Sequence, residues 1–151
     1  FVLHLLATKS KATELFLVRP SIGNEYSFAH MSKEELIMAY NNKVFIPAAT
    51  LEVLAQLWPC YQNKEHKQMI EIAKSVHKEF PFVLPAVEAD KARVPDESGM
   101  GYPEHVLFDI INKQQTCSFA EAFKVFHKKM GIYSFGDLQV KVMYERLMRD
   151  I

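Results

Sequence analysis

Arg19 is the residue of this chain whose type and surroundings best suit ligand binding. It ends the apolar run Leu15 to Val18, and a turn of small residues begins just after it at Ser21. An arginine buried in a sheet is costly unless an anion pairs with it. Its guanidinium can hold two phosphate oxygens in a bidentate pair, which a lysine cannot do. The sequence therefore predicts a phosphate site with Arg19 at its base.

The turn that follows can supply the remaining hydrogen-bond donors. Two are the hydroxyls of Ser21 and Ser27, and backbone N–H groups that curl around an anion can add more. These N–H groups belong to Ile22, Gly23 and Asn24. Gly23 permits the required backbone angles without steric cost. His30 and Lys33 lie near the same end of the predicted sheet and are additional candidates, although we favour the alternative that both face solvent.

Two interpretations of Arg19 remain open from the residues alone. In the first, Arg19 lies deep enough that phosphotyrosine reaches it and the shorter phosphoserine does not, and phosphotyrosine brings a charge near −2 with three acceptor oxygens. In the second, Arg19 is structural and pairs with Glu14 or Glu25 across a hairpin. The two differ in whether binding depends on phosphate.

The first third of the chain reads as a small meander of strands behind a helix. The apolar block Val2 to Ala7 fits the last turns of a helix. Alternation and turn residues then predict strands over 15–19, 26–31, 36–40 and 43–46. The pair Asn41-Asn42 tolerates positive φ, so a tight turn is expected between the last two strands.

After Pro47 the apolar residues follow a helical period for most of the chain. Helices are expected over 51–58, 69–80, 105–112, 118–130 and 135–148. Pro59 and Pro81 are expected to end the first two. Ser118 with Glu121 forms a capping-box pattern at the start of the fourth. The stretch 82–102 carries several prolines and glycines, so we expect an irregular loop there, and its part 91–102 could fold over a peptide or only connect helices.

The run Phe-Leu-Val-Arg-x-Ser at 16–21 resembles the phosphotyrosine-binding signature of SH2 domains. Further positions fit the same family: Leu3, Leu5 and Leu6 in a first helix, 25–28 and 43–46 in later strands, and 134–138 with Val142 and Tyr144 in a second helix. The resemblance covers about the first third of the chain and its last stretch. It implies that Arg19 binds the phosphate of a phosphotyrosine. The family's first-helix arginine would fall before Phe1, and its fourth-strand histidine has no counterpart.

The resemblance implies an α+β fold with a small central antiparallel sheet, a helix on each side and a large helical insertion. The SH2-like core would comprise 1–47 and 133–151, and the insertion would comprise 48–132. Similar insertions occur in SH2-like domains of intracellular-bacterial effectors, where they cover the bound peptide. We expect the insertion to act as a lid or clamp that tightens binding without reading side chains closely.

Composition excludes several other classes of protein. The chain has 151 residues with 18 basic and 18 acidic side chains, so no overall charge favours nucleic acid or an anionic membrane. Cys60 lies near His66 in the sequence, yet no acid or oxyanion pattern accompanies them. The histidines and cysteines lack the usual spacing of metal ligands. We therefore expect no enzyme, no cofactor and no metal ion.

The remaining expectations concern location and partners. Cys60 and Cys117 stand far apart and suit a reducing compartment, so we expect a cytoplasmic protein, or one in the host cytoplasm if it is a secreted bacterial effector. The sequence starts at Phe1 rather than Met, and we expect it to be part of a longer chain. We expect a monomeric module that binds tyrosine-phosphorylated peptides. The alternative is a helical protein–protein interaction adaptor with no phosphate dependence.

Overall fold

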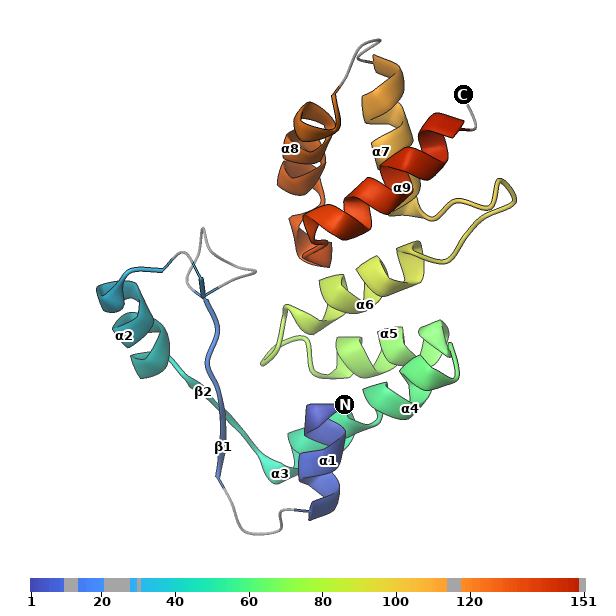
Figure 1. Cartoon of the computed structure of the whole chain (residues 1–151). Helices are drawn as coiled ribbons and strands as arrows, with labels where there is room; N and C mark the ends of the chain where they lie inside the picture. Colours follow the sequence, from blue (N-terminus) through green and yellow to red (C-terminus); the bar gives the residue numbers. More distant parts are fainter. Residues whose placement is uncertain (10–13, 21–27, 30, 114–117, 150–151) are drawn as a thin grey trace. The chain divides into compact units, whose positions relative to one another are not determined.

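A computed structural model describes residues 1–9, 14–20, 28–29, 31–113 and 118–149. The described chain is α+β: mostly helical, with a two-stranded antiparallel sheet (Figure 1). Its contacts define two units, residues 1–87 (unit 1) and residues 88–151 (unit 2). Residues 133–149 fall in unit 2, where α9 packs against the two preceding helices of that unit.

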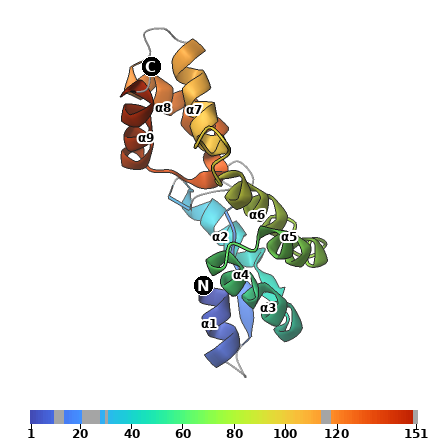
Figure 2. The same ribbon diagram turned by 90° about the vertical axis from the view of Figure 1, so that its right-hand side faces the viewer.

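Unit 1 contains the sheet and the first helices. Its elements are α1 (Val2–Lys9), β1 (Leu15–Leu17), α2 (Lys33–Asn41), β2 (Val44–Ile46), α3 (Ala48–Ala55), α4 (Leu57–Gln62), α5 (His66–Ser75) and the first half of α6 (Val83–Ala92). α1 packs against α3, as Figures 1 and 2 show. The helix expected over 2–7 and the strand expected over 43–46 are thus confirmed.

The sheet of unit 1 is short and has two unlike faces. Leu15 pairs with Ile46 and Leu17 with Val44 in an antiparallel register. Because side chains alternate along a strand, Leu15, Leu17 and Ile46 share one face, and they pack into a core cluster with Phe80. Phe16 on the opposite face is exposed. The sheet therefore contributes one face only to the core.

The strand expected over 36–40 is wrong, because these residues lie in α2. The Ser32 hydroxyl accepts a hydrogen bond from the Glu35 backbone N–H at 3.2 Å, and a Glu35 carboxylate oxygen accepts one from the Ser32 N–H at 2.7 Å. This capping box starts a helix through an apolar run whose periodicity alone is ambiguous. Asn42 caps the helix end. Of the strand expected over 26–31, positions 26, 27 and 30 lie outside the described residues, and 28–29 are not in a strand.

Two prolines lie inside helices at places where the sequence predicts a helix end or a loop. Pro59 lies in α4 and Pro85 in α6, each at the third position of its helix. The first turn tolerates proline because its N–H groups have no partner within the helix. The irregular loop expected over 82–102 is therefore wrong for residues 83–92 and correct for the stretch that follows. α5 ends at Ser75, five residues before Phe80, where the expected helix ended.

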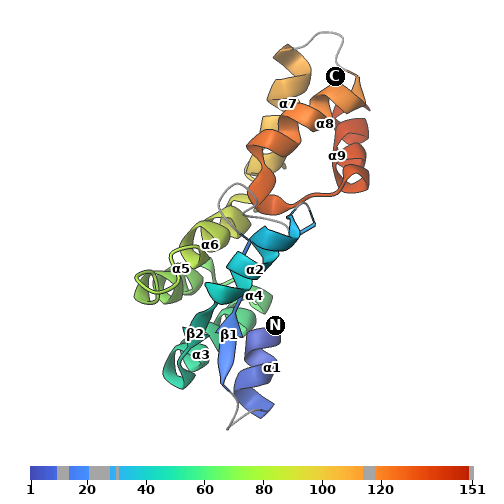
Figure 3. The same ribbon diagram turned by 90° about the vertical axis from the view of Figure 1, so that its left-hand side faces the viewer.

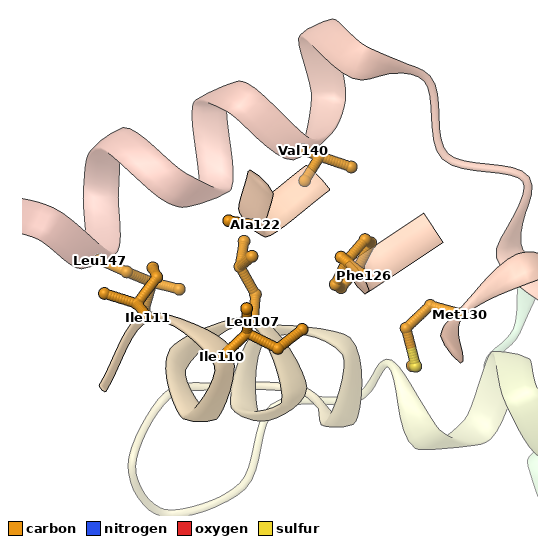
Figure 4. Close-up of a cluster of buried hydrophobic side chains, with 8 residues drawn as sticks. All are labelled: Leu107, Ile110, Ile111, Ala122, Phe126, Met130, Val140 and Leu147. Carbon is orange, nitrogen blue, oxygen red and sulfur yellow. The ribbon is translucent and has the colours of Figure 1, made fainter. Parts of the chain in front are cut away.

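Unit 2 contains the second half of α6 and a group of helices that pack on one another (Figure 3). They are α7 (Tyr102–Lys113), α8 (Phe119–Lys129) and α9 (Asp137–Arg149), with a 3-10 turn, η1, at Gly131–Tyr133. The capping box of Ser118 and Glu121 is present as predicted. Leu107, Phe126 and Val140, one from each helix, lie at the centre of the core and are at most 1% exposed (Figure 4). The three helices expected in this part of the chain are confirmed, with small shifts at their ends.

Candidate anion-binding site

Arg19 lies two residues beyond the end of β1 and is exposed to solvent. The expectation that it sits deep in a sheet is wrong. The pairing of β1 and β2 stops at Leu17 and Val44, because the chain before β2 belongs to the end of α2, capped by Asn42. Arg19 therefore lies outside the pairing of β1 with β2, and its side chain is exposed.

The guanidinium of Arg19 instead rests on an aromatic ring. Its central carbon lies 3.8 Å from the centroid of the Phe82 ring. Phe82 is half-buried, packs onto the core cluster of unit 1, and meets the Phe80 ring edge-on at 6.0 Å. Since Phe80 is 1% exposed, the Phe82 ring under Arg19 packs against a side chain of the core. A cation over an exposed ring is stabilised by about 0.5–1 kcal/mol.

The contact with Phe82 does not use the hydrogen-bond donors of Arg19. Guanidinium has five N–H donors, and a contact with the face of a ring does not require them. Among the described residues, no carboxylate forms an ion pair with Arg19, and Glu14 is one of those residues. The structural pairing with Glu14 is therefore absent, while Glu25 lies outside the described residues. Within the described part of the chain, Arg19 is thus a cation held at the surface over the Phe82 ring, and its pairing with Glu25 stays an open alternative.

Most of the other predicted site residues fall outside the described part of the chain. These are Ser21, Ile22, Gly23, Asn24, Ser27 and His30. Lys33 is described, is exposed and begins α2, which is the solvent-facing alternative of the two that the sequence left open. Of the predicted residues, the structure thus gives positions for Arg19 and Lys33.

Phe82 is the site residue that sequence reasoning missed. It lies far from Arg19 in the chain, and the contact of a cation with a ring follows no spacing rule. Phe82 follows Pro81 in a stretch where the sequence predicts an irregular loop, so no local pattern marks its side chain as part of a site.

Cys60, which carries a potentially reactive thiol, lies in a hydrophobic core cluster. It is 4% exposed and packs with Met69 and Val87. Burial raises the pKa of its thiol, and a hydrogen bond with Glu65 and the charge of Glu65 raise the pKa further. A thiol with a raised pKa is a poor nucleophile because the thiolate is the reactive form. These surroundings suit a structural cysteine.

Two properties of the described residues bear on the class of site. No three or more His, Cys, Asp or Glu side chains of this part of the chain are grouped in a way that could hold a metal ion. Nor does any helix within it have the length and apolar character needed to cross a membrane. Comparison of the chain with protein-family models, with curated proteins and with solved structures found no match.

Proposed function

We propose that the chain is a phosphotyrosine-dependent peptide-binding module in which Arg19 holds the phosphate. The observation that carries the proposal is the Arg19 guanidinium, which is exposed and lies 3.8 Å from the Phe82 ring centroid. Arg19 also lies two residues before Ser21, where the sequence predicts a small-residue turn that would donate further hydrogen bonds. A phosphate dianion offers three acceptor oxygens to such a cation, and two of them match the guanidinium in a bidentate pair.

Phe82 contributes to this site in two ways. Its ring restricts the guanidinium before the ligand arrives, so less conformational entropy is lost on binding. A phenyl ring beside the cation also offers an apolar contact to the tyrosine ring that carries the phosphate, which phosphoserine lacks. The preference for phosphotyrosine then arises from an aromatic surface and not from the depth of the pocket.

The remaining donors are assigned to the residues named from the sequence. Ser21 and Ser27 would donate hydroxyl groups, and the backbone of 22–24 would donate N–H groups. His30 and Lys33 are secondary candidates. Phe82 belongs to the segment 48–132 that is expected to cover the peptide, so the contact with Arg19 joins that segment to the proposed phosphate site.

The SH2-like form of the fold is part of this proposal, together with a monomeric state and a cytoplasmic location. The described sheet has two strands, and residues 133–149 pack with α7 and α8. The structural support for the proposal is therefore the contact between Arg19 and Phe82. The family resemblance is the reason that phosphotyrosine is proposed as the anion.

A peptide titration tests the proposal. The full chain is titrated with a degenerate peptide mixture centred on phosphotyrosine, and with the matched mixtures that contain tyrosine or phosphoserine. We expect binding of the phosphotyrosine mixture alone, and a loss of about tenfold or more in Arg19→Ala. Arg149→Ala, which changes an exposed arginine of unit 2, is the control. Equal affinity for the phosphotyrosine and tyrosine mixtures would refute the proposal.

One observation favours the adaptor as a second candidate. Leu36, Ile37, Met38 and Tyr40 of α2 are each between 42% and 58% exposed. Such a group of apolar side chains is typical of a surface that contacts another protein. If Ile37→Glu abolishes partner binding while Arg19→Ala leaves it intact, the adaptor is the correct function.

A further inference from the structure

Unit 2 contains an open cavity of about 500 Å³ between the loop 93–101 and α9. Its walls are mainly apolar and include Pro95, Pro103, Phe135 and Val142. The volume lies within the range of sites that hold a large side chain or a small ligand. All of its lining residues belong to unit 2, so the cavity is separate from Arg19.

The loop that forms one wall is held in place by hydrogen bonds. Asp96 accepts hydrogen bonds from the Ser98 hydroxyl and backbone N–H, and its second carboxylate oxygen lies 2.8 Å from His105 Nε2 on α7. Gly101 is buried and donates its N–H to Glu104 at 2.8 Å. These contacts tie the loop to α7, so the cavity exists before any ligand binds.

The opposite wall is held by stacked rings. Phe135 stacks on Tyr133 with centroids 5.3 Å apart and planes at 4°, and on Phe126 at 6.2 Å. Phe126 is 1% exposed, and the Tyr133 hydroxyl donates a hydrogen bond to the Ala89 carbonyl at 3.0 Å. These contacts hold the Phe135 ring in place as an apolar wall of the cavity.

The charged residues at the cavity are two arginines and one glutamate. Arg146 forms an ion pair with Glu104, whose side chain is 17% exposed. Arg93 is 52% exposed, and its guanidinium carbon lies 5.7 Å from the Phe135 ring centroid. Its ion pair with Asp90 spans 3.9 Å, at the outer limit for such a contact. The cavity lining thus has one more arginine than glutamate, and Arg93, whose ion pair with Asp90 is long, presents its charge at the cavity edge.

The apolar surface continues from the cavity along α9. Val142 lines the cavity and is 69% exposed, and Leu138, one helical turn away, is 73% exposed. Residues at this spacing lie on the same face of a helix. A ligand that covers both must be longer than a single side chain, which favours a polypeptide over a small molecule.

We propose that this cavity binds an acidic peptide segment of a partner protein. One large apolar side chain of the segment enters between Phe135 and Val142, and a neighbouring carboxylate pairs with Arg93. Charge complementarity with Arg93 selects an acidic segment over a basic one. This site needs no phosphate and does not involve Arg19.

An array of unphosphorylated nine-residue peptides tests this proposal with the full chain. Each peptide places Leu, Phe or Met beside Asp or Glu in a Gly-Ser frame, and each has a twin with Asn or Gln in place of the acid. We expect the acidic peptides to bind and their amide twins to bind about fivefold or more weakly. Arg93→Glu and Val142→Asp should each abolish binding. Lys141→Glu, an exposed change on the same helix, and Arg19→Ala should leave it unchanged.

Three outcomes would overturn the proposal. The first is that no acidic peptide of the array binds or shifts the NMR signals of Phe135 and Val142. The second is equal binding by the acidic peptides and their amide twins. The third is a concentration-dependent dimer that Val142→Asp dissociates, since the occupant would then be a second copy of the chain. Failure of phosphotyrosine binding in the earlier titration affects none of these results.

Discussion

The Phe82 ring lies under the Arg19 guanidinium, with 3.8 Å between the central carbon and the ring centroid. Arg19 follows a strand and Phe82 precedes a helix, so two distant segments of unit 1 form one surface feature. The ring orients the cation, and the core cluster around Phe80 holds the ring.

Replacing Phe82 by leucine should weaken phosphotyrosine binding without abolishing it. Leucine retains an apolar side chain but removes the contact with the cation, so the affinity should fall about threefold to fivefold. Isothermal titration of the wild type and the variant with one phosphotyrosine peptide measures this change. Phe16→Leu, which alters an exposed ring on the outer face of β1, serves as the control. An unchanged affinity in Phe82→Leu would show that the ring does not orient Arg19 for binding.

The core of unit 2 should depend strongly on Phe126. This side chain is 1% exposed and packs with Leu107 and Val140. Phe126→Ala should lower the free energy of unfolding by about 3–5 kcal/mol. Leu138→Ala, at a position 73% exposed, should change it by less than about 0.5 kcal/mol. Urea denaturation followed by circular dichroism compares the two, and similar losses in both would mean that the core is misassigned.

Gly101 and Gly136 should respond differently to alanine. A Cβ at Gly101 would lie 2.5 Å from the backbone carbonyl oxygen of Arg93, which cannot move without shifting the loop. A Cβ at Gly136 would meet only the Gln139 side chain at 4.0 Å. Gly101→Ala should therefore destabilise unit 2 by about 1–3 kcal/mol, while Gly136→Ala should be tolerated. Thermal unfolding of both variants gives the answer, and an unaffected Gly101→Ala would disprove the close approach of the loop.

Unit 2 should lose stability in acid partly through Asp96. Hydrogen bonds from Ser98, then one from His105, lower the pKa of Asp96 from 3.8 to about 2. A carboxyl group with a lowered pKa in the folded state favours folding above its unfolded pKa. That contribution is lost as the pH falls from about 4 to about 2.

Asp96→Asn tests this dependence. The variant should be less stable than the wild type at neutral pH, and the difference should shrink as the pH falls through that window. Melting temperatures measured at several pH values give the comparison. A difference that stays constant would contradict the role assigned to Asp96.

A capping box is the sequence pattern that predicts where a helix of this chain begins. Ser118 and Glu121 predicted α8, and the capping box is present. Ser32 and Glu35 form the same pattern before α2, but the apolar run after them was interpreted as a strand. A short apolar run fits either structure, so the cap was the only local signal that decided between them.

Contacts between distant segments could not be predicted from the sequence. The pairing of β1 with β2 ends at Leu17, and the short sheet leaves Arg19 exposed where the sequence suggested burial. The contact with Phe82 depends on how α6 begins, and the prolines and glycines of 82–102 predict a loop there, although the first turn of a helix accepts Pro85. Residue type identified Arg19 as a candidate, but only the tertiary structure supplied Phe82.

The measurement closest to the central claim observes the Arg19 guanidinium itself. Its side-chain Nε–H signal is assigned in an NMR spectrum by its loss in Arg19→Lys. The full chain is then titrated with a phosphotyrosine peptide and with the unphosphorylated twin. The account predicts a saturable shift of this signal with the phosphorylated peptide alone, while the Arg149 signal does not move. A signal unchanged at saturating phosphopeptide, or moved equally by both peptides, would contradict it.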